Sequence, residues 1–214
     1  MKKSSILILI IICLVGCKKG SNETTITGEI KGLGTDTLYL YGMDELYDRI
    51  DTIYVENDKF SYTTSVDTIT SAYLLLKNRI EYPVFLDKGN KIKIKGDTIN
   101  LNFLTISGNI YNEEFTDFQK ALEDPADPSE KAGEETVDKR ITVEKANTAE
   151  EMAEEFILQH HSSYVSLYLL DKYFVQKETP DFSKIKKLVE VMTGVLQDKP
   201  YIERLNETIT QAEK

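Results

Sequence analysis

Cys17 is the side chain whose type and position most clearly predict a covalent reaction. It follows an apolar run from Ile6 to Val15, which itself follows the basic pair Lys2-Lys3. A basic start, a short apolar core and a small residue at the cut are typical of a secretory signal. The run is far shorter than the roughly 20 residues that span a bilayer. A cysteine thiolate is the strong nucleophile among side chains, and Cys17 directly follows the small residue Gly16 at which such a signal would end.

The tetrapeptide Leu14-Val15-Gly16-Cys17 resembles the bacterial lipobox. In that class of protein the cysteine thiol receives a diacylglyceryl group, the chain is cut before the cysteine, and the new amine is usually acylated. The resemblance implies an outer membrane lipoprotein, held to the membrane through its N-terminal lipid. Asn22-Glu23, after Lys18-Lys19, offers no clear acidic export signal, so we expect the protein to face the periplasm. An ordinary cleaved signal and an uncleaved N-terminal helix are the alternatives.

Charge and cysteine usage exclude several kinds of chemistry. The 214 residues include 36 acidic and 26 basic side chains, a net charge of −10, so the chain is a poor candidate for binding nucleic acid or an anionic lipid surface. Of its two cysteines, Cys13 would leave with the signal and Cys17 would carry lipid. We therefore expect no disulfide, no thiolate metal site and no cofactor.

Residues 24–108 read as a series of short strands separated by turn signals. The eight expected strands cover residues 25–30, 37–41, 49–55, 60–63, 72–76, 82–86, 91–95 and 103–107. Pro83 suits an edge strand, and Lys91 to Lys95 alternates with one lysine face toward water. This spacing predicts an antiparallel β-sandwich or a partly closed barrel.

The hydrophobic period becomes helical after Gly108. The fold class is therefore α+β, with the sandwich followed by a small all-helical unit. We expect these segments: signal peptide 1–16, tether 17–23, β-sandwich domain 24–108, connecting helix 109–122, a mobile or partly helical acidic linker 123–148, and helical domain 149–214. At the start of the helical domain, a capping box of Thr148 and Glu151 predicts a helix through Gln159. Further helices are expected over residues 164–174, 184–196 and 201–212. The two halves are expected to fold separately.

The order of parts resembles a known family. A lipobox is followed by a Tyr-rich sandwich that opens with Thr27-Gly28-Glu29-Ile30, by the turn Lys88-Gly89-Asn90, and by helices that contain His160-His161-Ser162-Ser163-Tyr164-Val165-Ser166. This order is similar to the N-terminal region of Bacteroidota-type thioredoxin-like thiol:disulfide oxidoreductase lipoproteins, a domain of unknown function followed by helices. In that family a thioredoxin domain with Trp-Cys-x-x-Cys comes next. This sequence has no such motif, so no catalytic residue is carried over.

Three groups of polar residues could bind a metal or act as acid and base. His160 and His161, with Glu154 and Glu155 nearby, could form a weak metal site, but adjacent helical positions point about 100° apart, so a solvent-facing pair at a helix end is favoured. Glu150, Glu151, Glu154 and Glu155 could form carboxylate dyads, but a solvated face is favoured. Glu123, Asp124, Asp127 and Glu130 could attract calcium, yet they lack the spacing of a calcium loop. We predict no metal site.

Strand tyrosines and threonines suggest surface roles. The tyrosines at 39, 41, 54, 62, 73 and 82 could line a carbohydrate or peptide groove, although ordinary sheet packing is favoured. Four Asp-Thr-aliphatic tripeptides resemble the acceptor motif of Bacteroidota envelope O-glycosylation, at Thr37, Thr52, Thr68 and Thr98. The alternative is that Asp closes turns and Thr opens strands. We expect Thr98 to be the best acceptor and Thr52 the poorest.

These observations favour a cell-envelope lipoprotein that is not an enzyme. We expect a binding or interaction module for an envelope protein or peptide, accessory to a separately encoded thioredoxin-like oxidoreductase. The alternative is a truncated remnant of such an oxidoreductase. The nucleotides after codon 214 would separate the two, since an out-of-frame thioredoxin domain would indicate truncation.

Overall fold

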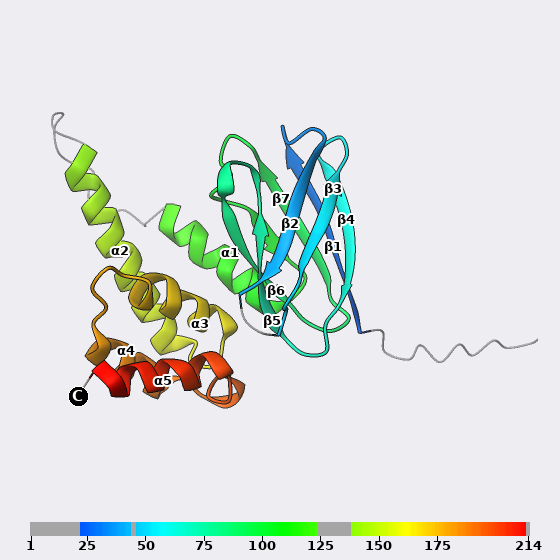
Figure 1. The fold of residues 1–214 in the computed structure, drawn as a ribbon. Helices are drawn as coiled ribbons and strands as arrows, with labels where there is room; N and C mark the ends of the chain where they lie inside the picture. The colour runs from blue at the N-terminus through cyan, green and yellow to red at the C-terminus, as the bar shows by residue number, and fades with distance from the viewer. Residues whose placement is uncertain (1–21, 44–45, 124–137, 213–214) are drawn as a thin grey trace, which may run out of the picture.

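The computed structural model describes residues 22–43, 46–123 and 138–212, in which eight strands are followed by helices (Figure 1). The strands are β1 (Glu23–Lys31), β2 (Asp36–Gly42), β3 (Ile50–Val55), β4 (Lys59–Ser65), β5 (Thr70–Leu75), β6 (Glu81–Leu86), β7 (Lys91–Asp97) and β8 (Thr105–Ser107). The α-helices are α1 (Ile110–Glu123), α2 (Asp138–Gln159), α3 (Tyr164–Leu170), α4 (Phe182–Val191) and α5 (Pro200–Ala212). Short 3₁₀-helices, η1 (Lys77–Arg79) and η3 (Gly194–Leu196), and a π-helix, η2 (Asp171–Val175), complete them. No described helix is both long and apolar enough to cross a membrane. The predicted signal peptide and Cys17 lie outside the described residues.

The strands form two four-stranded sheets. Sheet A has the order β4-β1-β7-β8 and sheet B the order β3-β2-β5-β6, which confirms the predicted sandwich and the α+β class. The alternative of a partly closed barrel is wrong, because the two sheets are not joined by a ladder between named strands. The pairing is antiparallel except between β1 and β7, which run parallel. Alternation predicts which face a side chain takes, but it carries no information on the direction of the neighbouring strand.

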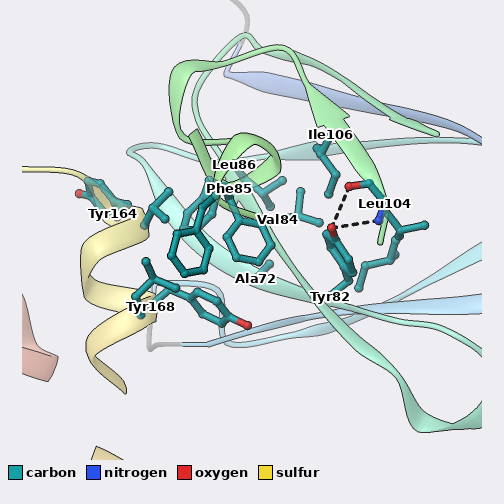
Figure 2. Close-up of a cluster of buried hydrophobic side chains, with 14 of the residues drawn as sticks. Ala72, Tyr82, Val84, Phe85, Leu86, Leu104, Ile106, Tyr164 and Tyr168 are labelled. Atoms are coloured by element: carbon teal, nitrogen blue, oxygen red, sulfur yellow. Dashed lines mark hydrogen bonds between the residues drawn. The ribbon is translucent and has the colours of Figure 1, made fainter. Parts of the chain in front are cut away.

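Tyr82 ties the two sheets together inside the sandwich (Figure 2). This residue of β6 is buried, and its hydroxyl donates to the Leu104 carbonyl at 2.7 Å. The same hydroxyl accepts from the Leu104 N–H at 3.0 Å, just before β8. Since a buried phenol needs a polar partner, this pair of bonds fixes the distance between the sheets. Pro83, the next residue, lies in edge strand β6 as predicted.

Helix α1 covers the free edge of β6 through one side chain. Asn112 is buried, its Oδ1 accepts from the Phe85 N–H at 3.0 Å, and its Nδ2 donates to the Phe85 carbonyl at 2.8 Å. The amide thus makes the two bonds that a further strand would have made with Phe85. An open edge is a site for unwanted pairing, and α1 closes it here.

The helical half shares its core with the sandwich. Tyr168 of α3 makes edge-on ring contacts with two residues. Its ring centroid lies 5.2 Å from that of Phe115 of α1 and 6.4 Å from that of Tyr73 of β5. Tyr111 of α1 contacts Tyr164 of α3 at 5.2 Å. The buried residues of both halves form one continuous cluster, part of which is drawn in Figure 2. The helices are therefore packed on the sandwich.

The helix boundaries differ from the predictions in two places. Helix α2 begins at Asp138, so the linker is partly helical, which was one of the two expectations for it, but Thr148 lies inside the helix and is not its cap. The expected helix over residues 184–196 ends at Val191, because Met192 is extended and Gly194 has a φ of +64°. Positive φ favours glycine and breaks a right-handed helix.

Candidate functional site

The outer face of sheet B carries a patch of aromatic and aliphatic side chains, of which Tyr39, Ile50 and Tyr54 are exposed and Tyr41 and Leu75 are half-buried. We call it the tyrosine face, and it consists of Tyr39 and Tyr41 of β2, Ile50 and Tyr54 of β3, and Leu75 of β5. The exposed fractions are 73% for Ile50, 73% for Tyr54 and 41% for Tyr39. Exposed patches of this kind on a soluble fold mark interaction sites more often than scattered single residues do.

Strand alternation and register bring these residues together. Leu38 and Leu40 of β2 are buried between the sheets, so the tyrosines on either side of them point outward. Tyr39 lies opposite Thr52 of β3 and Leu75 of β5. Tyr41 lies opposite Ile50. Directly opposed residues are about 5 Å apart, so the side chains form a continuous surface.

Tyr41 is held in place at the helical side of the tyrosine face. Its ring lies 5.6 Å from that of Tyr73, and its hydroxyl donates to the Glu81 carboxylate. Burial and this carboxylate raise the pKa of Tyr41 above its ordinary value. Tyr73 in turn contacts Tyr168 of α3. The orientation of Tyr41 is therefore fixed before any partner arrives.

A cleft lies at the end of the tyrosine face where β2 ends and β3 begins. Its volume is about 450 Å³, and its lining includes Tyr41, Met43, Tyr47, Arg49, Ile50 and, from α5, Arg204. Apolar and aromatic walls with a few cationic groups are typical of sites that bind a partner side chain or a small molecule. The tyrosine face and this cleft share Tyr41 and Ile50, so they form one continuous surface.

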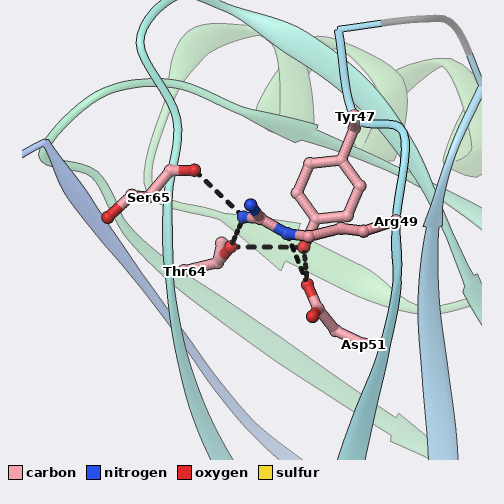
Figure 3. A network of polar contacts seen from close by, with 5 residues as sticks. All are labelled: Tyr47, Arg49, Asp51, Thr64 and Ser65. Atoms are coloured by element: carbon pink, nitrogen blue, oxygen red, sulfur yellow. Dashed lines mark hydrogen bonds and ion pairs between the residues drawn. The ribbon is translucent and has the colours of Figure 1, made fainter.

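A polar cluster beside the cleft joins β3 to β4, the neighbouring edge strands of the two sheets (Figure 3). The Tyr47 hydroxyl donates to the Asp51 carboxylate, and the Cζ atom of Arg49 lies 4.6 Å above the centroid of the Tyr47 ring. Arg49 also pairs with Asp51 at 3.1 Å, and it donates to the Thr64 hydroxyl and to the Ser65 carbonyl. The cluster holds together a corner of the sandwich at which no ladder forms.

The cluster shifts the pKa values of its own members. Burial tends to raise the pKa of Asp51, but hydrogen bonds from Tyr47, Tyr62 and Arg49 outweigh this effect, so the pKa lies below its ordinary value. Burial and the hydrogen bond to Asp51 raise the pKa of Tyr47 to about 12. Asp51 is therefore a charged acceptor at neutral pH, and Tyr47 stays protonated.

The histidine pair occupies the turn between α2 and α3 and contacts two other elements. The His160 ring stacks on the Phe156 ring with 4.2 Å between the ring centroids, and its Nδ1 lies 3.5 Å from the Glu114 carboxylate of α1. The His161 Nδ1 lies 3.1 Å from the Thr193 hydroxyl. The helix-end position agrees with the prediction, and both rings link the turn to other segments. In the part of the chain that the structure describes, no three His, Cys, Asp or Glu side chains are grouped so as to hold a metal.

The glutamates of α2 belong to an ion-pair network at the surface. Glu150 pairs with Lys177 at 2.5 Å, and Glu154 pairs with Lys184 at 2.7 Å. Glu151 and Glu155 are exposed. Of the residues considered for calcium, Glu123 is exposed and accepts from the Asn100 amide at 2.7 Å. Asp124, Asp127 and Glu130 lie outside the described residues.

The four threonines considered for glycosylation differ in exposure from the expected order. Thr52 and Thr68 are exposed, whereas Thr37 and Thr98 are half-buried. Thr98 lies in a turn as expected, but its hydroxyl packs over Gly32. Thr52 lies within β3 with its side chain outward, since alternate residues of this strand face water. On exposure alone, Thr52 and Thr68 are the better acceptors; modification itself stays a prediction.

The six candidate tyrosines separate into different environments. Tyr39, Tyr41 and Tyr54 lie on the tyrosine face, with Tyr73 at its boundary, whereas Tyr82 is in the core and Tyr62 lies near Asp51. Sequence reasoning missed Ile50, Leu75 and Arg204. The alternation of outward and inward residues in β3 and β5 could have identified Ile50 and Leu75. The sequence around Arg204 does not indicate that α5 brings this residue to the cleft.

Comparison with known proteins identifies part of the chain. Residues 24–115 match the model of a domain of unknown function (DUF4369). The match covers the sandwich and the start of α1, which include the tyrosine face. No curated protein and no solved structure matches the chain.

Proposed function

We propose that this protein is a cell-envelope lipoprotein, anchored through Cys17, that acts as a binding module without catalysis of its own. The observation that carries the proposal is the tyrosine face. Tyrosine and large apolar side chains are enriched in protein interfaces, where they anchor binding. On this surface Ile50 and Tyr54 are 73% exposed although they lie on a well-packed sheet.

The partner that this surface fits best is another envelope protein. Aliphatic Ile50 and Leu75 alternate with tyrosine rings, which suits protein side chains better than a ligand held only by hydrogen bonds. The cleft at the end of the face adds apolar Met43 and the charged side chains of Asp48, Arg49 and Arg204 to the same surface. The resemblance to thioredoxin-like lipoproteins supports an oxidoreductase of that kind as the partner.

The anchor is tested by intact mass and fractionation in the native host. We expect the wild-type mass to equal the chain from Cys17 plus acyl groups, and the Cys17→Ala variant to carry no acyl groups and to keep residues 1–16. Extra mass that disappears with Thr52→Ala or Thr68→Ala would reveal glycosylation in the same measurement. An unmodified Cys17 in mature, membrane-bound protein would exclude the anchor.

Binding is tested by native electrophoresis of detergent-extracted envelopes. We expect wild-type protein to migrate in an assembly that the double variant Tyr39→Ser, Tyr54→Ser loses. The matched control replaces Leu158 and Val195, which are exposed apolar residues of the helical half. The proposal fails if wild type migrates alone, or if the control variant loses the assembly to the same extent.

A further inference from the structure

The outer face of sheet A is rich in lysine, in contrast to the tyrosine face on sheet B. Lys31 of β1, Lys59 of β4, and Lys91, Lys93 and Lys95 of β7 are all exposed on this side. The residues between them in sequence, such as Ile92 and Ile94, are buried between the sheets. The alternation that was predicted from the sequence thus places five ammonium groups on one surface.

In the described part of the chain, none of these five lysines forms an ion pair with a carboxylate, although Glu29 lies in register between Lys59 and Lys95. Among the described residues the lysine ion pairs involve other lysines, at positions 77, 120, 177 and 184. The acidic residues on the same face are Glu23, Glu29 and Asp97, so lysines outnumber them. In a chain of net charge −10, this face is locally basic.

The lysine-rich face carries two shallow, open hollows. One hollow of about 520 Å³ is lined by Glu29, Lys31, Lys95, Asp97, Asn100, Phe103 and Thr105, together with Gly96. A second, of about 350 Å³, is lined in part by Thr27, Glu29, Lys59, Lys93 and Lys95. The two share Glu29 and Lys95 in their linings, so they lie side by side over β4, β1 and β7. We call this pair of hollows the lysine groove.

The wall of the lysine groove after β7 is held by hydrogen bonds. The Asp97 carboxylate accepts from the Ile99 N–H at 2.9 Å, and the Phe103 N–H donates to the Asn100 carbonyl at 3.2 Å. The Asn100 amide donates to Glu123 at the end of α1. The polar groups that line the groove are therefore positioned in advance, which lowers the entropic cost of binding.

The lining contains the three kinds of group that an acidic sugar needs. Carboxylates such as Glu29 and Asp97 accept hydrogen bonds from sugar hydroxyls. Lys31, Lys93 and Lys95 would pair with carboxylate, sulfate or phosphate substituents. Phe103 offers an apolar ring to the carbon face of a sugar. We infer that the lysine groove binds an acidic oligosaccharide, independently of the partner proposed for the tyrosine face.

The central position of Glu29 argues against nucleic acid and anionic lipid as ligands. It lies in register between Lys59 of β4 and Lys95 of β7. A carboxylate among the cations repels a continuous row of phosphates, but it serves a ligand rich in hydroxyl groups. The substitution Glu29→Gln therefore separates the two classes, because it would strengthen binding of a simple polyanion and weaken binding of a sugar.

The test is calorimetry on the full mature protein in detergent, with a tetramer of galacturonic acid and a sulfated tetrasaccharide as probes. We expect at least one probe to bind, with an affinity that falls as salt rises because the contacts are charged. Lys31→Gln with Lys95→Gln should reduce the affinity by about tenfold or more. The matched control Lys88→Gln with Lys187→Gln removes two exposed lysines elsewhere and should leave it unchanged.

Two comparisons sharpen the result. The methyl-esterified galacturonate tetramer, which has the same sugars without charge, should bind at least about tenfold more weakly. Glu29→Gln should lower the affinity for the acidic tetramer. The inference is overturned if neither acidic probe binds, if an oligodeoxynucleotide or phosphatidylglycerol vesicles bind more tightly than both, or if Glu29→Gln strengthens binding.

Discussion

Asn112 shows how one side chain can determine where a helix docks. It lies on α1, where the sequence predicted an apolar stripe from Ile110 to Leu122 and gave a polar residue no special place. In the structure it is 1% exposed and bonded to both backbone groups of Phe85. A buried polar residue can be recognised only when its partner is known, and that partner lies on β6, 27 residues earlier in the chain.

Replacing Asn112 with Leu should destabilise the protein. The Phe85 carbonyl would keep a bond from the Asn109 amide at 2.8 Å, but the buried Phe85 N–H would lose its acceptor. A buried donor without a partner costs about 1–3 kcal/mol, and urea unfolding should show a loss of that size. The control Asn206→Leu, at an exposed site on α5, should change stability by less than about 0.5 kcal/mol. Equal effects of the two changes would contradict the docking role.

Asp51 should make stability depend on pH in the acid range. Its pKa in the folded protein is held below the ordinary value by hydrogen bonds from Tyr47, Tyr62 and Arg49, which outweigh burial. A depressed pKa means that the carboxylate stabilises the fold above its unfolded pKa of 3.8, and that this contribution is lost as pH falls through the folded pKa.

The substitution Asp51→Asn tests this dependence. We expect a loss of about 1–3 kcal/mol at pH 7, because hydrogen bonds to a charged group are removed. We also expect a shallower fall in the free energy of unfolding between about pH 5 and pH 2 than wild type shows. Asp48→Asn, at an exposed neighbouring position, is the control. A variant that keeps the wild-type slope would show that Asp51 is not a source of acid sensitivity.

At the scale of elements, the packing of β1 against β4 depends on the absence of a side chain at Gly28. A Cβ built there would lie 2.1 Å from the tip of the Phe60 ring. Gly28 lies opposite Phe60 in the antiparallel pair, so the ring crosses the strand at this position. Any larger residue must displace it.

Gly28→Ala should therefore destabilise the sandwich by about 1–3 kcal/mol, the usual effect of overpacking. Phe60→Leu in the Gly28→Ala background should recover part of that loss, because the shorter side chain leaves room for the methyl group. Thermal unfolding of the two single variants and the double variant measures the coupling. If the stability changes of the two single variants simply add in the double variant, the Phe60 ring is not what excludes a side chain at position 28.

The elements themselves were largely predictable from the sequence. All eight strands lie where alternation and turn signals placed them, because period-2 patterns are local and each strand has one buried face. The sheet order and the parallel pairing of β1 with β7 were not predictable, since both depend on partners far apart in the chain. The start of α2 was missed because residues 138–148 have too few apolar residues to show a helical period.

The candidate site was predictable only in part. Tyr39, Tyr41 and Tyr54 were among the strand tyrosines considered for a groove, and alternation places each on an outer face. Their assembly into one face required the register of β2 with β3 and β5, which the sequence does not contain. The lysines of β7 were predicted to face water, but the hollow beside them is created by the turn after β7.

At the scale of the whole molecule, the two halves share one core although the sequence suggested separate units. The contacts of Tyr168 with Phe115 and Tyr73 cross the boundary between helices and sandwich. Patterns of composition locate segments with few apolar residues, but they do not show whether the flanking segments pack together. We therefore expect cooperative unfolding of both halves.

Tyr168→Ala should lower the stability of β5 and α3 together. Truncation of a buried aromatic residue costs about 3–5 kcal/mol, and hydrogen exchange should show the slowest amides of both elements opening with the same reduced free energy. Exposed Tyr39→Ala is the control and should leave exchange in α3 unchanged. If β5 keeps its protection while α3 loses it, the halves are separate folding units after all.

Site-specific photo-crosslinking in the native envelope tests whether the tyrosine face is the contact surface of the proposed module. A photoreactive phenylalanine analogue replaces Tyr39 or Tyr54 in the full-length protein. In the two controls it replaces Leu158 or Val195, which are exposed residues of the helical half. We expect a discrete crosslinked protein adduct from the positions at Tyr39 and Tyr54, and none from the two controls. The same adducts at all four positions, or none at Tyr39 and Tyr54 while the variants remain in the membrane fraction, would contradict this role of the tyrosine face.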